Sequence, residues 1–467
     1  MNPKEQLCSI FGADACITDG KRLERYRIDQ VGDEAYAQVP VAVVFPTQTE
    51  QVVRLMRWAN QTGTPITPRG GGTGLAGAAI PVSGGIVCSF ERMDQIIEID
   101  TDNLMVVTQP GVVTSRLDEA LKPHGLFFAG YPMSEDICCI GGNVAENAGG
   151  GRAVKYGTTA RYVLGAEVVT PIDDVLRLGG KRLKDVTGYN LLQLMIGSEG
   201  TLGLFTELTI RVVPRPEARA LLFAGFHDGS SAVECVTALK RIPALSSVEF
   251  IDGITARATN AELPANDRCD LPEEVEAFLL IEVDEIDAGQ LSRMMGSAER
   301  AVTTAEGTVV LRGSEPRSFE QAWKLRKAVP WWTKRVAGKW HSMEDVVVPP
   351  AQVPALVAYA DQLRSQYAMP IAVFGHAGDG NFHITPMKSH SMSEKQWDIS
   401  IAQLLADLYR TVYKLGGTIS GEHGIGRKRT PYLDIVLSES ERSVMKQIKH
   451  SLDPNGVLNP GVALDEA

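Results

Sequence analysis

The sequence lacks any uninterrupted apolar stretch long enough to form a transmembrane helix. Its first residues, Met1 to Lys21, also lack the apolar core of a secretory signal. The seven cysteines are odd in number, scattered, and include no C-x-x-C pair. Together these features argue against a disulfide scaffold, a zinc finger or an iron–sulfur cluster. We therefore expect a protein of the reducing cytoplasm.

Basic residues are in deficit. The chain has 46 Lys and Arg against 57 Asp and Glu, which gives a formal net charge of −11. This balance disfavours nucleic acid or an anionic membrane as the main partner, although a small anionic substrate needs only a locally basic pocket. With 467 residues, 44% of them hydrophobic, the chain is long enough for two or three domains and a large buried core.

The chain from Pro40 alternates strand and helix patterns. Pro40 to Pro46 predicts a short buried strand, and a capping-box pattern at Thr47 and Glu50 predicts the start of an amphipathic helix that ends at Gly63. Pro65 to Pro68 predicts a second strand, which leads into three consecutive glycines. This order is typical of an α/β nucleotide-binding domain.

The pattern changes beyond Val212 to Pro216, a segment with two prolines that predicts a linker. Strands are predicted at Ala220 to Phe226 and at Ala277 to Asp284, with amphipathic helices near Ser231 to Arg241 and Ala288 to Ala305. This arrangement indicates a separate α+β domain.

Three glycine-rich segments lie in the first part of the chain, at Arg69 to Gly74, Ile140 to Arg152 and Gly188 to Gly203. In the first, consecutive glycines let backbone N–H groups converge on an anion, with no Cβ atoms in the way. A lone run of this kind is more often a tight surface turn, and this one is neither a Rossmann nor a P-loop motif. Three such segments within one domain strengthen the prediction of a pyrophosphate site.

Two glycine-flanked segments later in the chain carry three of the eight histidines. They read G-H-A-G-D-G-N-F-H from Gly375 to His383 and S-G-E-H-G-I-G from Ser420 to Gly426, and we expect both to form turns. Two imidazoles and a carboxylate are a standard ligand set for a catalytic divalent ion. Either segment alone is equally well explained as a surface turn, but the two together favour a site. The other histidines are expected to be structural or exposed: His124, His227, His341, His390 and His450.

These motifs resemble those of a known family. P-R-G-G-G-T-G, the run C-I-G-G-N-V-A-E-N-A-G-G from Cys139, and K-D-V-T-G-Y-N followed by G-S-E-G-T-L-G resemble the FAD-binding domain of the vanillyl-alcohol oxidase superfamily. Within it, the chain resembles the D-lactate, glycolate and D-2-hydroxyglutarate dehydrogenase branch, from about Pro40 to Pro460. The resemblance implies an α+β fold with a vanillyl-alcohol-oxidase-type (PCMH-type) FAD-binding domain and an α+β substrate or cap domain.

The expected division of the chain into domains follows from the family resemblance and from the change in strand and helix pattern after Pro216. It has an N-terminal segment at 1–37, the FAD-binding domain at 38–216, the substrate domain at 217–415, and a C-terminal segment at 416–467 that returns to the flavin. The tail from Ser451 is rich in turn residues and carries no charge run, so we expect it to dock.

The resemblance also implies the cofactor residues. The loop from Arg69 to Gly74 is expected to hold the FAD pyrophosphate. Several relatives carry a flavin-linked histidine at the position of Thr73, so FAD is expected to be non-covalent here. The full set of implied flavin-binding residues is Arg69, Gly70, Gly71, Gly72, Thr73, Gly74, Pro132, Ser134, Gly141, Gly142, Asn143, Asn147, Gly149, Gly150, Gly200 and Asn459. For Asn459 a plain turn is nearly as good an interpretation.

The two histidine motifs match the metal motifs of this branch. The match implies His376, His383 and Glu422 as ligands of zinc or manganese, and His423 as the catalytic base. Such an ion lowers the pKa of a bound hydroxyl, a histidine accepts the proton, and a hydride passes to flavin N5. The segment from Trp323 to Lys327 resembles the W-x-x-R segment of the family, which implies Arg326 as the ligand of the substrate carboxylate, with a solvated helix charge as the alternative.

The favoured reaction is oxidation of a D-2-hydroxy acid, with D-lactate or glycolate preferred. Family members specific for D-2-hydroxyglutarate have a lysine where this chain aligns Met343, and methionine cannot pair with a second carboxylate. Glu344 would repel that carboxylate if it faced the pocket, whereas Lys339 offers a compensating charge nearby. A D-2-hydroxyglutarate dehydrogenase, a zinc-dependent hydrolase and a flavin subunit of a larger oxidase complex remain the alternatives.

Electrons are expected to pass to a separate acceptor: a quinone, an electron-transfer flavoprotein or an iron–sulfur subunit. Through that acceptor the cytoplasmic protein could be peripheral to the membrane. The sequence leaves the oligomeric state open, with a homodimer as one option.

Overall fold

The computed structural model describes residues 3–172, 174–285, 287–313 and 315–464. The chain forms two compact units. Unit 1 comprises Met1–Gly149, Thr158–Pro214 and Glu422–Ala467, and unit 2 comprises Gly150–Gly157 and Arg215–Gly421. Among the described residues, no helix is long and apolar enough to cross a membrane.

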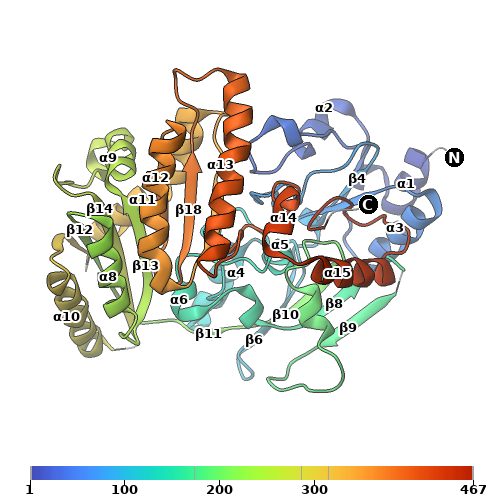
Figure 1. Cartoon of the computed structure of the whole chain (residues 1–467). Coiled ribbons are helices and arrows are strands. Elements are labelled where there is room, and N and C mark those ends of the chain that lie inside the picture. The colour runs from blue at the N-terminus through green and yellow to red at the C-terminus, as the bar shows by residue number, and fades with distance from the viewer. Residues whose placement is uncertain (1–2, 173, 286, 314, 465–467) are drawn as a thin grey trace. The chain divides into compact units, whose positions relative to one another are not determined.

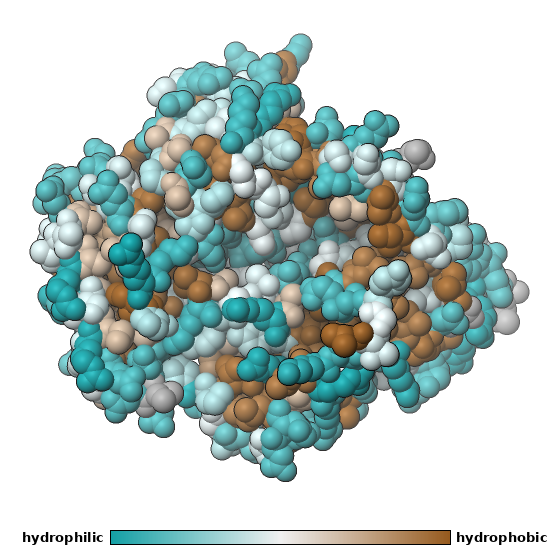
Figure 2. All heavy atoms as spheres, turned by 60° about the horizontal axis from the view of Figure 1, so that its bottom comes forward, coloured by the Kyte–Doolittle hydropathy of each residue, from teal (hydrophilic) through white to brown (hydrophobic). Residues whose placement is uncertain are grey.

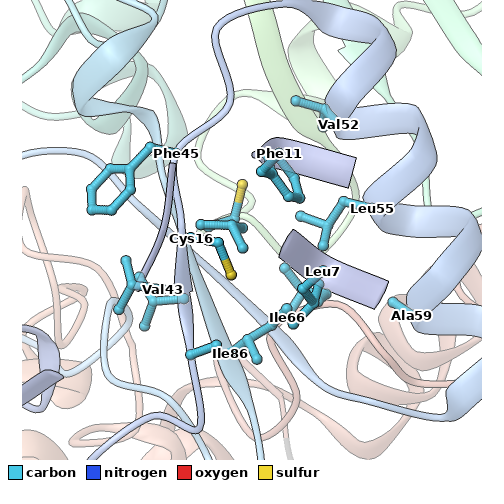
Figure 3. Close-up of a cluster of buried hydrophobic side chains, with 14 of the residues drawn as sticks. Leu7, Phe11, Cys16, Val43, Phe45, Val52, Leu55, Ala59, Ile66 and Ile86 are labelled. Atoms are coloured by element: carbon cyan, nitrogen blue, oxygen red, sulfur yellow. The ribbon is translucent and has the colours of Figure 1, made fainter. Parts of the chain in front are cut away.

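Unit 1 begins with a small sheet whose strand order is β1 (Cys16–Ile17), β2 (Val43–Val44), β4 (Ile86–Ser89) and β3 (Ile66–Arg69). Strands β2, β4 and β3 run parallel, and β1 is antiparallel to β2. Helices α1 (Pro3–Phe11) and α3 (Thr49–Thr62) contribute apolar side chains to the same core, as Figure 3 shows. The N-terminal segment is therefore part of the core of unit 1.

Helix α3 confirms the predicted helix but not its predicted cap. The backbone N–H and hydroxyl of Thr47 both donate to Gln51 Oε1, at 2.7 and 3.1 Å, so Gln51 reaches back in place of Glu50. The helix starts after Gln48, whose side chain makes no capping hydrogen bond. At its other end Gly63 adopts a φ of 67°, the left-handed C-terminal position that glycine favours.

A second, antiparallel sheet in unit 1 has the order β5 (Ile96–Asp100), β6 (Met105–Thr108), β10 (Leu204–Arg211), β8 (Val163–Val169) and β9 (Val175–Gly179). The predicted linker is partly ordered as a strand, since β11 (Val213–Pro214) pairs with β7 (Leu126–Phe127). The remaining α-helices of unit 1 are α2 (Gly20–Leu23), α4 (Thr114–Leu121), α5 (Ile140–Glu146), α7 (Leu191–Met195), α14 (Leu433–Val436) and α15 (Glu439–Leu452).

Unit 2 is built on a seven-stranded antiparallel sheet. Its strand order is β15 (Thr308–Gly313), β12 (Ala218–Phe226), β14 (Ala277–Glu285), β13 (Leu245–Asp252), β17 (Ile371–His376), β18 (Asn381–Pro386) and β16 (Glu344–Val347). Helices α8 (Gly229–Leu239), α10 (Ala288–Thr304), α12 (Val353–Tyr367) and α13 (Glu394–Lys414) pack on one face (Figure 1). Helices α9 (Gly253–Glu262), α11 (Pro316–Ala337) and the short α6 (Ala153–Tyr156) pack on the other. The strands and helices predicted for this part of the chain are confirmed, with ends shifted by a few residues.

The face that α11 covers is divided between apolar and polar side chains. Leu221, Phe223 and Ile251 pack there against Leu325 of α11. Because strand side chains alternate between faces, the register also places Glu249, Asp345, His376 and His383 on this face. The polar group thus lies beside a packed apolar core, which fixes its geometry.

The surface of the chain carries apolar side chains in patches among hydrophilic ones, as Figure 2 shows for one face. Large exposed apolar residues concentrate between residues 172 and 194 of unit 1. Val186 is 97% exposed and Tyr189 is 96% exposed.

Candidate active site

The first histidine motif forms a strand–turn–strand hairpin. His376 is the last residue of β17 and His383 lies within β18, so the histidines are on strands, and the expectation that they occupy turns was wrong. Only the intervening Gly380, with a φ of 86°, has the left-handed backbone that a glycine-flanked turn requires. The hairpin register brings the two imidazole rings to 5.5 Å between centroids, and both side chains are buried.

Glu249, on the neighbouring strand β13, was not identified from the sequence because no motif surrounds it. It pairs in register with His376, whose Nδ1 lies 2.8 and 2.9 Å from the two carboxylate oxygens. Burial raises the pKa of Glu249, but the charges of His376 and Arg326 and hydrogen bonds from His376 and Ser247 bring it below its ordinary value. Metal-bound histidines usually have a carboxylate or carbonyl on the nitrogen that does not bind the metal, and the contact between Glu249 and His376 Nδ1 has this form.

Arg326 is also part of this buried polar group. Its side chain is 1% exposed, its Nε lies 2.7 Å from Glu249 Oε2, and its guanidinium lies 5.1 Å from the centroid of the Phe374 ring. The alternative of a solvated helix charge was therefore wrong. The buried Nη2 has no hydrogen-bond partner among the residues described, which is a costly state for a charged donor unless a ligand satisfies it.

Asp345 of β16 connects the hairpin to the second histidine motif. Its carboxylate accepts hydrogen bonds from Asn381 Nδ2 at 2.7 Å, from the Ser420 hydroxyl at 2.8 Å and from the Gly421 N–H at 2.9 Å. His383 Nδ1 lies 3.9 Å from Asp345 Oδ1. Gly421 is the last residue of unit 2, and Glu422 and His423 follow it directly in the chain.

The residues considered for substrate selection lie on the same strand or just before it. Met343 is half-buried and packs against the apolar core under α11. Glu344 points to the opposite face, where it accepts hydrogen bonds from Tyr409 and, at 2.5 Å, from Ser342, so the repulsion considered for it does not apply. Lys339 is exposed, with its Nζ 4.3 Å from the centroid of the Trp340 ring.

In unit 1 the glycine-rich segments pack closely against one another. A Cβ atom on Gly71 would overlap the carbonyl of Ile137, and one on Gly200 would overlap the Pro68 ring. A Cβ atom on Gly141 would overlap Pro110, whereas one on Gly142 would meet no atom within 4 Å. The glycines therefore bring the loops together while leaving backbone open beside Gly142, which fits a cradle for a phosphate-containing cofactor.

Several implied flavin-binding side chains have hydrogen bonds within unit 1. Arg69 Nη1 donates to the Ala79 carbonyl at 3.2 Å, and Asn143 Nδ2 donates to the Thr114 hydroxyl at 2.9 Å. Asn147 Oδ1 accepts from the Ala160 N–H at 2.9 Å. All the implied flavin positions lie in unit 1 except Gly150, the first residue of unit 2.

The C-terminal segment docks on the same loops of unit 1. The Asn459 N–H donates to the Ile66 carbonyl at 2.8 Å, and its side-chain Nδ2 donates to the Ala78 and Glu199 carbonyls at 3.0 and 2.8 Å. The expectation that the tail docks is confirmed. Glu422, also in unit 1, lies 3.5 Å from the Cβ position of Gly149, so an implied metal ligand adjoins an implied flavin loop.

Comparison with known proteins identifies both parts of the chain. Residues 40–179 match a model of an FAD binding domain, and residues 215–463 match the C-terminal domain of FAD linked oxidases. Glycolate oxidase subunit GlcD of Bacillus subtilis is 35% identical, covering 98% of this chain and 96% of its own length. D-2-hydroxyglutarate dehydrogenase of Stutzerimonas stutzeri is 32% identical over 98% of this chain and 97% of its own. D-lactate dehydrogenase of Anaerostipes hadrus is 34% identical over 90% of this chain and 89% of its own.

Solved structures share the fold. p-Cresol methylhydroxylase superposes with a TM-score of 0.81 at 18% identity, covering 99% of this chain and 96% of that one. An alkyldihydroxyacetonephosphate synthase superposes with a TM-score of 0.77 at 19% identity, covering 98% of this chain and 84% of that one. These likenesses confirm the expected α+β architecture of the vanillyl-alcohol-oxidase type. Taken with the family matches, they show that the chain belongs to the FAD-linked oxidases, a family of FAD-dependent oxidoreductases.

Proposed function

We propose that this protein is an FAD- and divalent-metal-dependent dehydrogenase that oxidises a D-2-hydroxy acid to the 2-oxo acid. The observation that carries the proposal is the buried polar group of unit 2, in which His376 and Arg326 both contact Glu249. The substrates named for the three relatives all carry a carboxylate beside the hydroxyl-bearing carbon. Arg326, whose buried Nη2 has no hydrogen-bond partner in the described part of the chain, offers a donor for that carboxylate.

The residues of this chain have separate roles in the proposed reaction. FAD supplies hydride acceptance at N5, and a divalent ion on His376, His383 and Glu422 supplies polarisation of the substrate hydroxyl. His423 accepts the hydroxyl proton. Arg326 orients the substrate through its carboxylate, and Glu249 holds the Nδ1 side of His376. Zinc and manganese both suit this ligand set.

We favour D-lactate or glycolate over D-2-hydroxyglutarate. Met343 offers no charge to a second carboxylate, and Lys339, the cation closest to it in sequence, lies against Trp340 on the surface. A second buried carboxylate without a partner costs several kcal/mol, enough for a discrimination of about a hundredfold. The electrons then leave to a separate acceptor, for which a quinone, an electron-transfer flavoprotein and an iron–sulfur subunit are the candidates.

A substrate screen tests the reaction. Purified protein would be assayed with an artificial dye acceptor and D-lactate, glycolate or D-2-hydroxyglutarate, and kcat/KM would be compared. We expect D-lactate or glycolate to rank first. If D-2-hydroxyglutarate ranks first, the argument from Met343 is wrong, and if no hydroxy acid reduces the flavin, the proposed reaction is wrong.

Metal removal tests the proposed dependence on a divalent ion. Prolonged chelation should abolish turnover while FAD stays bound, and zinc or manganese should restore it. Full activity in protein verified to be free of metal would contradict the proposed role of His376, His383 and Glu422.

A further inference from the structure

The loop that follows His423 is held by a buried carboxylate within unit 1. Glu199 accepts a hydrogen bond from the Ile425 N–H at 2.9 Å on Oε1 and from the Gly426 N–H at 2.7 Å on Oε2. The side chain is nearly inaccessible, since Glu199 is 6% exposed. One carboxyl group therefore accepts hydrogen bonds from two successive amides that begin two residues after His423.

The backbone of Glu199 is in an unfavourable conformation. Its φ is 51°, in the left-handed region that glycine and asparagine tolerate and glutamate rarely adopts. Its neighbours Gly197 and Gly200 have φ values of 74° and 65°, so a third glycine would suit this turn better. A strained backbone at a buried residue supports the hypothesis that its side chain has a function.

Other contacts fix Glu199 and the loop it holds. The Glu199 N–H donates to the Ala145 carbonyl at 2.8 Å, and the Glu199 carbonyl accepts from Asn459 Nδ2 at 2.8 Å. Arg429 is fully buried, and its Nη1 donates to the Gly424 carbonyl at 3.0 Å. Gly424 has a φ of 79°, and a Cβ atom on it would overlap Glu146 and come within 3.1 Å of Glu199 Oε2. The loop can adopt few other positions.

We propose that Glu199 is the positioning residue for His423. Its backbone belongs to the glycine-rich turn that contains Gly200, an implied flavin contact, and its carboxylate holds the loop that carries the implied base. Within unit 1, Glu199 would thus fix the position of the loop that carries His423 relative to the glycine-rich turn that contains Gly200. This inference rests on the proposed function, because it takes His423 to be the base.

Two variants of the FAD-loaded enzyme test the proposal. Glu199→Gln keeps the shape of the side chain but replaces one acceptor oxygen with an N–H donor. Glu199→Gly removes the side chain and relieves the backbone strain, so this variant should fold even if Glu199→Gln does not. The matched control is Glu441→Gln, which removes a carboxylate that also accepts a backbone N–H, that of Ser438, but from the exposed N-terminus of α15.

Hydrogen exchange reports on the loop directly. In both Glu199 variants we expect the Ile425 and Gly426 amides to exchange faster, FAD to stay bound, and the control to match the wild type. Flavin reduction by the best hydroxy acid should slow by about tenfold to a hundredfold, the scale expected when a reacting group is displaced by about 1 Å. Unchanged exchange, unchanged reduction, or loss of FAD in both variants would overturn the proposal.

A double-mutant comparison separates this inference from the proposed function. If Glu199 acts through His423, Glu199→Gln should slow flavin reduction little further in a His423→Asn background. If Glu199→Gln slows flavin reduction by the same factor in the wild-type and His423→Asn backgrounds, Glu199 does not act by positioning His423. A near-normal rate for His423→Asn alone would instead show that the proposed function is wrong in its choice of base.

Discussion

Glu249 offers the sharpest test of the buried polar group, through the single substitution Glu249→Gln. The change keeps the volume of the side chain and removes its charge. Wild-type Glu249 is fully buried, accepts from His376 and forms an ion pair with Arg326 at 2.7 Å. The amide leaves the charge of Arg326 buried without a counter-charge, and breaking a buried pair in this way costs about 3–5 kcal/mol. Loss of the carboxylate behind a metal-bound histidine typically weakens metal binding by about 10–100-fold.

The two effects are measured separately and compared with a matched variant. Urea unfolding gives the loss of free energy of unfolding, and a competition titration on metal-free protein gives the metal dissociation constant. Glu282→Gln is the control, because Glu282 is on the same face of the same sheet, is fully buried, and accepts from Arg219 at 2.8 Å and Trp323 at 2.9 Å. Both variants should lose stability, but only Glu249→Gln should weaken metal binding. If both variants weaken metal binding equally, or if neither variant does, Glu249 is not the carboxylate that supports His376 as a metal ligand.

Three further predictions concern the flavin, the base and a buried acid. Acid precipitation should release all the yellow chromophore, since Thr73 has no imidazole to bond FAD, and colour in the pellet would contradict non-covalent binding. His423→Asn should keep FAD and metal yet slow flavin reduction by ~100-fold or more, the scale of losing a general base, whereas a near-normal rate would remove His423 from that role. Asp29 is 6% exposed, and burial raises its pKa to about 6, although Val31, Arg69, Ala79 and Gly77 oppose the shift. Because the folded protein holds this proton more tightly than the unfolded chain, stability should fall as pH rises from about 4 to above 6, by about 3 kcal/mol in all. Asp29→Asn should flatten that part of the unfolding profile while Asp102→Asn, at an exposed aspartate, should not. An unchanged profile for Asp29→Asn would show that Asp29 ionises normally.

Local patterns in the sequence were sufficient for much of the fold. The periodicity of α3, its end at Gly63 and the main strands and helices of unit 2 follow from side-chain spacing and from the conformational freedom of glycine, both of which act over a few residues. The glycine-rich segments and the histidine motifs were visible for the same reason. The roles proposed for them came from resemblance to a family, and the comparisons confirm that the chain belongs to that family.

Only the tertiary structure identified the residues that support those motifs. Glu249 has no motif, and it is 127 residues from His376 in the chain; strand pairing between β13 and β17 places them together. Glu199 is 226 residues from Ile425, and its left-handed backbone cannot be inferred from its being a glutamate. The burial of Arg326 likewise depends on which side of α11 faces the sheet. Sequence patterns predict conformations that are set by neighbouring residues. A buried charge depends instead on partners that are distant in the sequence, and only the register of the sheet and the path of the chain bring those partners within hydrogen-bond distance.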